Sequence, residues 1–555
     1  MFKLKNNFTI LLIILWQAIS VFLMATGVWP QEIVYLNTAL LAVFFLLASP
    51  LDSIRLFILS IPAYVVIPNS YSDTLSMWRP LLILLFTVIA IKTYLSFPRK
   101  RESRTWFWIL DQVRNDIQRK AFLKSPDFYF IGFIILAALS TLIARYPSET
   151  IKQIIFLINA YLIYILIRLT IKTKDQIVTI TKSVLISLGL IVVLGFVQFI
   201  STFFTSSYYF WQYWATMVSK LYYGQSLADV LIYSNSWFSY TGGGSSLRMF
   251  SIMPDSHSFA LVCALAFLLC LPFIARRIER PVKFSRSHVN GTVMAILSGL
   301  GVILAGTRGV WVGMIAPFGI ALILYAKKIF RPASKNITIA FIFIILFFAI
   351  SPLINQGVGL IREVGRGGFF DRALSIYDLS EQSNVGRLEI WKESATYALI
   401  HPLGTGYGNF IVSLFNEIPS NTSYAQLAGM ENTRFNLPQK FVTAHSLYLH
   451  LLVEVGLLGL LVFLLWFASF LYRSGKYLWH HRNQFSFEHE LVLVICLFLI
   501  WVLTHGIFDL TLFNDKILLY VFSVMAIAMT ILRVNTNGID SNMRIGTNDT
   551  NKELV

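Results

Sequence analysis

Long apolar runs constrain this chain more than any other feature of its sequence. Stretches of about 20 predominantly apolar residues recur between residues 8 and 534, and each is long enough to cross a hydrocarbon layer roughly 30 Å thick as a helix. The chain is 56% hydrophobic and 13% charged, whereas an ordinary soluble domain carries about a quarter charged residues. A soluble core could not absorb this surplus. The sequence therefore predicts an all-α polytopic membrane protein.

The apolar runs predict about 12–14 transmembrane helices. The first run follows two lysines as a signal peptide would, but it lacks a small-residue cleavage site, so we expect a retained first helix. The third run is short and contains Pro62, which contributes to the range in the expected number. The expected spans are 8–27, 34–49, 53–68, 79–97, 128–144, 151–170, 183–203, 258–275, 290–306, 310–326, 337–355, 445–471, 490–508 and 515–533.

Basic residues between the spans set the expected orientation. The formal net charge of +17 is concentrated in short segments between apolar runs, which is typical of a topology signal. We therefore expect anionic membrane lipids, and no nucleic acid, as partners. Because cytoplasmic loops are enriched in Lys and Arg, both termini are predicted to be cytoplasmic. Five basic segments fall on the side of the N-terminus: 99–124, 172–182, 276–286, 327–335 and 473–482.

Two connections on the opposite, non-cytoplasmic face are too long to be simple turns, 201–257 and 356–444. The first is rich in Trp and Tyr, which suits a segment in the headgroup region. In the second, residues 386–400 predict a short amphipathic helix whose apolar face is formed by Leu388, Trp391, Ala395 and Leu399.

The same pattern divides the chain into three parts. Residues 1–127 are expected to hold N-terminal helices and a basic cytoplasmic loop. The main transmembrane domain is expected over 128–533, including both long outer loops. Residues 534–555 are polar, rich in Asn and Thr, and predicted to form a disordered cytoplasmic tail.

Arg308 is the most informative charged residue on the outer face. It lies with Thr307 and Gly309 between two apolar runs that leave almost no loop. A cation at that depth costs several kcal/mol unless an anion compensates it. Either Arg308 sets topology or joins a salt bridge at a helix turn, or it binds an anionic substrate. The rarity of arginines on the outer side of membrane proteins favours binding.

Two further residues on this face could carry chemistry. Arg248 precedes Asp255 and the eighth span; it could pair with Asp255, or hold phosphate oxygens together with Arg308. His445 stands at the outer mouth of a long span, where an imidazole could accept a proton from an attacking hydroxyl. Taken alone, His445 is more simply interpreted as an interfacial histidine.

Neighbouring residues receive more ordinary interpretations. His257 is expected to be a polar residue at a helix start rather than a ligand. Glu454 lies more than two helical turns deeper than His445 and is expected to pair within the bundle. The glycine-rich stretch 404–408 has no strand-turn-helix context, so a tight loop is favoured over a dinucleotide site. The sequence also lacks the paired aspartates that would hold a divalent ion for a nucleotide sugar.

Four motifs follow one another along the outer face. They are Leu247-Arg248-Met249-Phe250 with Pro254; Thr307-Arg308-Gly309; Gly386-Arg387-Leu388 to Trp391 followed by His401-Pro402-Leu403-Gly404-Thr405-Gly406-Tyr407-Gly408-Asn409-Phe410; and His445-Ser446-Leu447-Tyr448-Leu449 with Glu454, Gly456 and Gly459. Taken together, over roughly residues 130 to 530, they resemble the O-antigen ligase and O-antigen polymerase superfamily of bacterial membrane glycosyltransferases.

The resemblance implies an enzyme of the bacterial cytoplasmic (inner) membrane that transfers or polymerises a glycan carried on undecaprenyl diphosphate, at the outer face and without a metal or other cofactor. It assigns Arg248 and Arg308 to the diphosphate, His445 to the acceptor hydroxyl as general base or orienting group, and Arg387 to assistance in binding. The acceptor would be a glycan, a lipid or another hydroxyl compound. Because the lipid diphosphate is the leaving group, two guanidinium groups could neutralise its charge in place of a divalent ion.

Ligation and polymerisation are not separated by this sequence, since both would share the fold and the arginines. A different class, a lipid-linked oligosaccharide flippase or other transporter, is compatible with the number of spans. A transporter should show ionisable residues near mid-membrane and two related halves, and neither is evident in the sequence. A third hypothesis is a scaffold protein without catalytic activity. It predicts that the outer arginines are not required for function.

Overall fold

The structure, a computed structural model, is largely helical. It describes residues 2–68, 75–95, 125–233, 238–241, 244–279, 286–327, 341–342, 382–410, 443–483 and 486–549.

Eight helical segments in these described ranges are long and apolar enough to cross a membrane. They are α1 (Phe2–Ala25), α8 (Pro147–Thr170), α9 (Lys174–Ser201), α12 (Ser256–Glu279), α14 (Arg308–Gly313) together with α15 (Ile315–Ala326), α21 (Leu447–His480), α22 (Phe487–His505) and α23 (Asp515–Asp549). Shorter helices accompany them: α2 (Ile33–Leu47), α3 (Pro50–Leu59), α4 (Trp78–Leu95), α7 (Pro126–Leu139) and α13 (Arg286–Leu304). This architecture confirms the predicted all-α polytopic membrane fold.

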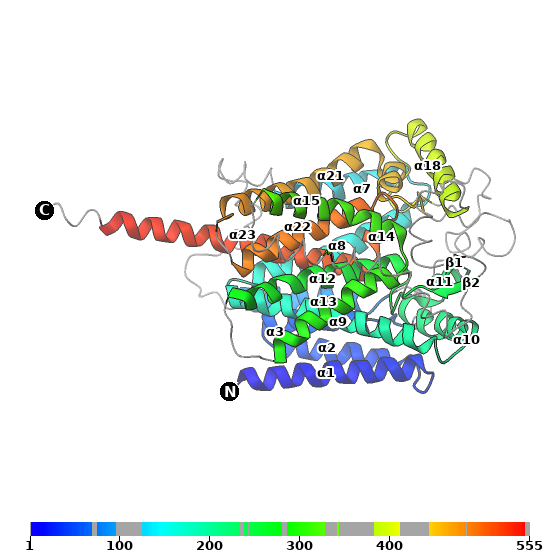
Figure 1. Cartoon of the computed structure of the whole chain (residues 1–555), viewed down its shortest axis with the longest axis horizontal. Helices are drawn as coiled ribbons and strands as arrows, with labels where there is room; N and C mark the ends of the chain where they lie inside the picture. Colours follow the sequence, from blue (N-terminus) through cyan, green and yellow to red (C-terminus); the bar gives the residue numbers. More distant parts are fainter. Residues whose placement is uncertain are drawn as a thin grey trace.

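The helices run along one common direction, with both chain termini near one end of the bundle, at the left in Figure 1. Shorter elements gather at the other end. They are α10 (Ser207–Tyr213), α11 (Lys220–Tyr233), α18 (Gln382–Ile400) and an antiparallel hairpin of β1 (Phe238–Thr241) and β2 (Gly244–Leu247). The site described below lies at this second end.

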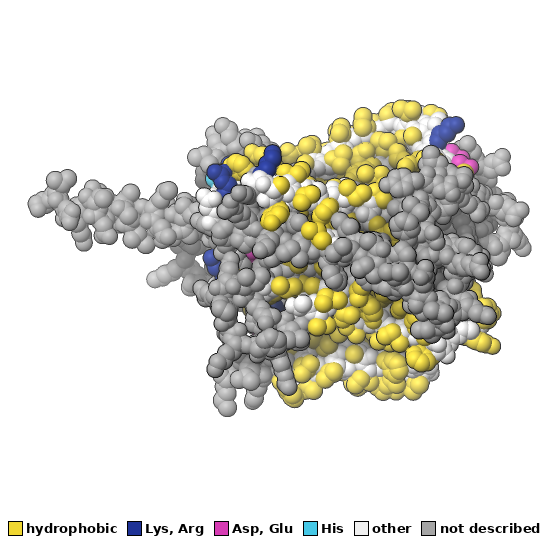
Figure 2. Space-filling view, viewed as in Figure 1, with side chains coloured by type: hydrophobic (Ala, Val, Ile, Leu, Met, Phe, Trp, Pro, Cys, Tyr) yellow, Lys and Arg dark blue, Asp and Glu magenta, His cyan; other side chains and the backbone are white. Residues whose placement is uncertain are grey.

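The outer surface of the bundle matches a lipid environment. Hydrophobic side chains cover the visible middle of the molecule, and the visible Lys, Arg, Asp and Glu side chains lie mostly toward its two ends (Figure 2). Large apolar residues such as Phe22 and Leu458 are more than half exposed on α1 and α21. In water this exposure would be costly, whereas lipid tails are as apolar as these side chains.

Helix α12 lies at the centre of the bundle, and its residues 259–271 are buried on every face. Helix α9 approaches α12 closely at Gly195, where an added Cβ would lie 2.4 Å from the Phe259 ring. Glycine is therefore required at this contact. The close approach fixes the start of α12, which carries polar residues of the site.

Some expected elements differ from the structure. The expected span 53–68 is instead α3, which ends at Leu59, followed by a short 3₁₀ turn at Ile61–Ala63 and an isolated bridge between Val66 and Ser76. Pro62 has no N–H to continue the helix and disfavours helical geometry before it. Helix α23 continues past the predicted end at 533, because a helix already formed by the span propagates at little cost. The expected span 337–355 lies almost entirely outside the described residues.

The helix expected at 386–400 is present as α18, but only part of its predicted apolar face packs: Trp391 packs against the cluster that includes Val453. Leu388 and Leu399 are 47% and 83% exposed, whereas Ile390 and Ala398 are buried and pack with Val453 of α21. Ser394, fully buried between them, is small enough to let α18 approach α21. Periodicity identifies an apolar stripe, but the neighbouring helix decides which stripe is covered.

Candidate functional site

Four helix ends meet at the second end of the bundle, where α12, α14 and α21 begin and α22 ends. The Thr307 hydroxyl before α14 donates to the Ser256 carbonyl at 3.4 Å, and the Leu447 N–H donates to the Gly506 carbonyl at 2.7 Å. Gly309 allows α14 to lie against the end of α22, since a Cβ there would be 2.9 Å from the Phe508 Cβ. Residues distant in the sequence are thereby brought into one cluster.

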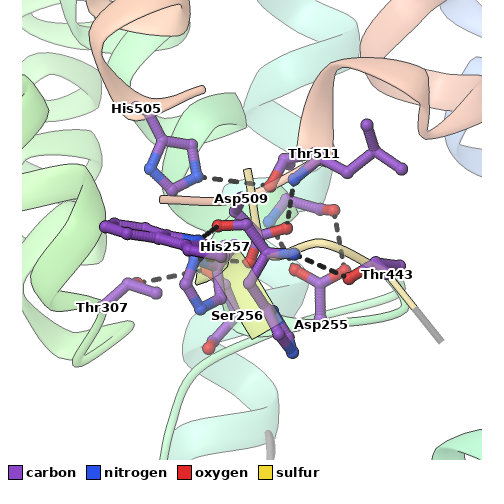
Figure 3. A network of polar contacts seen from close by, with 12 residues as sticks. Asp255, Ser256, His257, Thr307, Thr443, His505, Asp509 and Thr511 are labelled. Atoms are coloured by element: carbon purple, nitrogen blue, oxygen red, sulfur yellow. Dashed lines mark hydrogen bonds and ion pairs between the residues drawn. The ribbon is translucent and has the colours of Figure 1, made fainter. Parts of the chain in front are cut away.

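A carboxylate and two imidazoles form the core of this cluster. Asp509 Oδ2 lies 3.3 Å from His257 Nδ1, and the His257 ring stacks on the His505 ring with centroids 5.4 Å apart. His505 Nε2 is 3.2 Å from the Thr511 hydroxyl. Figure 3 shows Asp509 among His257, His505 and Thr511. His257 does stand at a helix start, as predicted, but its ring also faces Asp509.

Asp509 is the electrostatic centre of the site. Burial opposes its ionisation, but His257, His445, His505 and Arg387 favour the carboxylate strongly enough to place the pKa of Asp509 below its usual range. Asp509 is therefore ionised at neutral pH. It supplies the negative charge that the surrounding basic groups require.

Asp255 lies in the same region but behaves differently. Burial raises the pKa of Asp255 to about 6, and the nearby charge of Asp509 adds to the rise. Its carboxylate accepts hydrogen bonds from the Ser258 N–H at 2.7 Å and the Ser258 hydroxyl at 3.0 Å. Asp255 therefore caps the start of α12.

Arg248 is held in place by the backbone that follows it. The Met249 N–H donates to the Leu304 carbonyl at 3.2 Å, and the Gln198 side chain accepts from the N–H groups of Phe250 and Ser251 at 3.1 and 2.7 Å. Arg248 is half-buried and close enough to His257 to influence its charge. It thus borders the Asp509 cluster.

Arg308 and Arg387 reach the same region from two other helices. Arg308 is buried at the first residue of α14, beside the Thr307 to Ser256 contact. Arg387 projects from α18 and interacts electrostatically with His257, His445, His505 and Asp509. The structure therefore brings together the arginines that the sequence analysis selected.

His445 adopts a left-handed backbone conformation, with φ of 44°, immediately before α21. Its carbonyl accepts a hydrogen bond from Trp391 Nε1 at 3.3 Å, and its N–H donates to the Thr443 hydroxyl at 3.3 Å. Its Nδ1 has no hydrogen-bond partner among the described residues. Burial lowers the pKa of His445; Asp509 opposes this shift and Arg387 adds to it. A neutral imidazole at this position can accept a proton.

The glycine-rich stretch after α18 forms a tight loop, as predicted, and it fills a break in α21. Helix α21 is interrupted at Gly456, whose φ is 70°. The freed Glu454 carbonyl accepts from the N–H groups of Thr405 and Gly406 at 3.1 and 2.9 Å. The Glu454 carboxylate lies 3.2 Å from His450 Nε2, so this residue pairs within the bundle as expected.

Asp509 and His505 are not among the site residues predicted from the sequence. Both lie near the connection between the last two spans, which is too short to attract attention and contains no motif. One signal was available: Asp509 is an acidic residue in an otherwise apolar outer turn, Ile507-Phe508-Asp509-Leu510. Within the described residues, no group of three or more His, Cys, Asp or Glu side chains has an arrangement that could hold a metal ion.

Part of the chain is similar to a known protein family. Residues 293–464 match the family model described as O-antigen ligase, Wzy_C, and this range contains Arg308, Arg387 and His445. No curated protein matches the chain. Eight helices of the described residues are long and apolar enough to cross a membrane, and the family match over 293–464 supports an O-antigen ligase-like role in membrane glycan processing.

Proposed function

We propose that the protein is a membrane glycosyltransferase that moves a glycan from a polyprenyl diphosphate, undecaprenyl diphosphate in bacteria, to a hydroxyl of an acceptor. The observation that carries this proposal is the meeting of His445 and Arg387 with an ionised Asp509 at one end of the bundle. Arg248, which interacts with His257, and Arg308, at the buried start of α14, border this cluster. A neutral base and several guanidinium groups are the components that such a transfer requires.

The reaction can be written with the residues of this site. An acceptor O–H gives its proton to an imidazole nitrogen of His445 while the acceptor oxygen attacks the anomeric carbon of the donor sugar. The bond from that carbon to the diphosphate oxygen breaks, and the electron pair leaves with the lipid diphosphate. Arg248 and Arg308 stabilise the charge on this leaving group, and Arg387 assists in binding. His445 then releases the proton to water.

Asp509 has a supporting role in this proposal. Three arginines without an anion would repel one another when no substrate is bound, and one carboxylate reduces that repulsion. Asp509 also lies 3.3 Å from His257 Nδ1 and orients that ring. We expect it to act as a positioning residue that does not touch the reacting atoms.

We further propose that the site faces the outer side of the cytoplasmic membrane and that both termini are cytoplasmic. The basic residues Arg473 and Lys476 of α21 lie at the end of the bundle near the termini, in agreement with the positive-inside rule. Residues 128–533 would form the catalytic domain. The arginines would replace a divalent ion, so chelators should leave the activity unchanged. The position of the cluster at one end of the bundle favours an enzyme over a transporter, whose ionisable groups usually lie near mid-membrane.

The proposal is tested by replacing Arg248, Arg308 and His445 singly by Ala and assaying glycan products in membranes. Arg145→Ala is a suitable control, because Arg145 is an exposed arginine at the same end, outside the cluster. We expect each of the three variants to lose most product and the control to keep it. Normal product from all three, at normal protein abundance, would refute the proposal.

The same variants distinguish the two possible reactions. Accumulation of single repeat units on the lipid carrier would indicate lost polymerisation. Accumulation of long lipid-linked chains would indicate lost ligation to a final acceptor.

A further inference from the structure

A buried lysine lies near the site but outside the proposed mechanism. Lys516, in the first turn of α23, is 1% exposed, and its ammonium nitrogen has no hydrogen-bond partner among the described residues. Its nearest carboxylate oxygen, Asp515 Oδ1, is 4.0 Å away, beyond hydrogen-bond distance. An ammonium group has three N–H donors, and burying them unsatisfied is costly. The arrangement calls for an acceptor that the described residues do not provide.

The surroundings of Lys516 carry an excess of positive charge. Asp515 already accepts a hydrogen bond from Trp78 Nε1 at 3.1 Å and interacts with Arg79. The Nε atom of Arg79 is buried and also has no hydrogen-bond partner among the described residues. One carboxylate is thus shared by two cations, each with an unsatisfied donor.

Two tyrosines cover the ammonium group. The Lys516 nitrogen lies 4.9 Å from the ring centre of Tyr223 and 5.2 Å from that of Tyr222, close enough for cation–π attraction. Both tyrosines belong to α11, and the helical backbone of α11 breaks directly after them at Gly224, whose φ is 81°. The helix is therefore interrupted at the point where it covers Lys516.

One tyrosine also joins this place to the Arg248 segment. The Tyr223 hydroxyl donates to the Ile252 carbonyl at 2.6 Å. Burial raises the pKa of Tyr223, and the charges of Asp515 and Asp255 add to the rise, so the ring stands between these two carboxylates. Tyr223 therefore contacts both Lys516 and the segment that follows Arg248.

We propose that Lys516 and Arg79 form a second anion-binding site, which receives a phosphate oxygen of a phosphate-bearing lipid when Tyr222 and Tyr223 move aside. A phosphate oxygen would accept the unused N–H donors and balance the excess positive charge. The lipid is either a polyprenyl diphosphate or a membrane phospholipid headgroup. Only the first of these sources rests on the proposed function.

The first test measures the reactivity of Lys516 in the unaltered protein. The full-length chain is placed in phosphatidylcholine nanodiscs and treated with an amine-acetylating reagent, and modification of Lys516 and Lys220 is followed by mass spectrometry. Lys220 is an exposed lysine of the same segment and serves as the internal control. One arm adds farnesyl diphosphate, and a second replaces part of the phosphatidylcholine by phosphatidylglycerol.

We expect the occupying lipid to slow acetylation of Lys516, by about tenfold at ten times its Kd, and to leave Lys220 unchanged. Protection by farnesyl diphosphate assigns the site to a polyprenyl diphosphate, and protection by phosphatidylglycerol alone assigns it to a headgroup. The absence of selective protection in both arms would overturn the proposal.

The second test uses variants and measures the Kd of the protecting lipid. Lys516→Met keeps an apolar side chain of similar length, which suits the buried position, and should weaken binding about tenfold. Lys516→Arg should retain binding, and Lys220→Met should be unchanged. Equal Kd values for Lys516→Met and the unaltered protein would refute the site. Selective lipid protection together with normal glycan product in Arg248→Ala, Arg308→Ala and His445→Ala would refute the proposed function and leave this site standing.

Discussion

Replacement of Gly456 by Ala should disturb the site from a distance, because this glycine breaks α21 between His445 and the rest of the helix. Gly456 has φ of 70° and ψ of −177°, a conformation that is almost restricted to glycine. An added Cβ would lie 2.4 Å from the Pro402 carbonyl oxygen and 2.5 Å from the Leu403 carbonyl carbon. The backbone of the neighbouring loop would have to move.

The cost can be worked from these contacts. Holding a non-glycine residue in such a conformation costs about 1–3 kcal/mol. If the loop is displaced, three backbone bonds are lost: Thr405 and Gly406 to the Glu454 carbonyl, and Leu457 to the Pro402 carbonyl. Each is worth about 0.5–1.5 kcal/mol. A loss of several kcal/mol is expected, together with a changed direction of the first two turns of α21, which begin directly after His445.

The assay compares the Tm and the glycan transfer rate of the full-length protein in detergent. Gly475→Ala in the same helix is the matched control, because no atom lies within 4 Å of its added Cβ. This control should be neutral or slightly stabilising, since Ala favours a helix by about 1 kcal/mol relative to Gly. If Gly456→Ala behaved as Gly475→Ala does, the proposed role of the helix break would be wrong.

Three further predictions concern the site itself. The transfer rate should fall on acidification, because His445 is protonated and can no longer accept a proton. Burial lowers the pKa of His445, so the rate should fall below about pH 6.5. Asp509→Asn should move the midpoint of this fall to lower pH, and Arg387→Gln should move it to higher pH. Identical pH–rate profiles for these proteins would contradict the assignment of His445. Gly309→Ala, whose Cβ would lie 2.9 Å from the Phe508 Cβ, should lower kcat up to about 100-fold by displacing the segment that carries Asp509, whereas Gly319→Ala, with open space around it, should leave kcat unchanged. Asn409→Ala should lower the free energy of unfolding by about 1–3 kcal/mol, because the Tyr146 N–H loses its acceptor at 2.9 Å and the Thr150 hydroxyl its donor at 3.0 Å; an unchanged Tm would exclude this.

The motifs in the sequence were sufficient to select Arg248, Arg308, Arg387 and His445, and the structure brings these residues to one end of the bundle. Arg248 and Arg308 could be selected because charged residues are costly beside apolar runs, whereas Arg387 and the role of His445 came from the resemblance of the motifs to a known family. Their roles in binding and catalysis remain predictions. His257 was predicted to be a helix-start residue, and its partner Asp509 lies far from it in the sequence.

The packing face of α18 shows a second limit. The apolar stripe of Leu388 and Leu399 was visible in the sequence, but Ile390 and Ala398 make the contact with α21. The sequence of one helix determines where its apolar stripe lies, whereas the neighbouring helix determines which of its residues are buried. The same reasoning explains Gly404 and Gly456, whose backbones approach so closely that only glycine fits either position.

The sequence alone determined that this chain is a helical membrane protein, because lipid offers no hydrogen bonds to the backbone and only long apolar helices satisfy that condition here. Its motifs also selected four residues that could carry chemistry, Arg248, Arg308, Arg387 and His445. Only the tertiary structure decided that Asp509 and His505, from the last outer turn, meet His257 from the start of α12. Electrostatic interactions at about 3 Å form only where helix ends converge in the folded chain, and no local sequence pattern predicts that convergence.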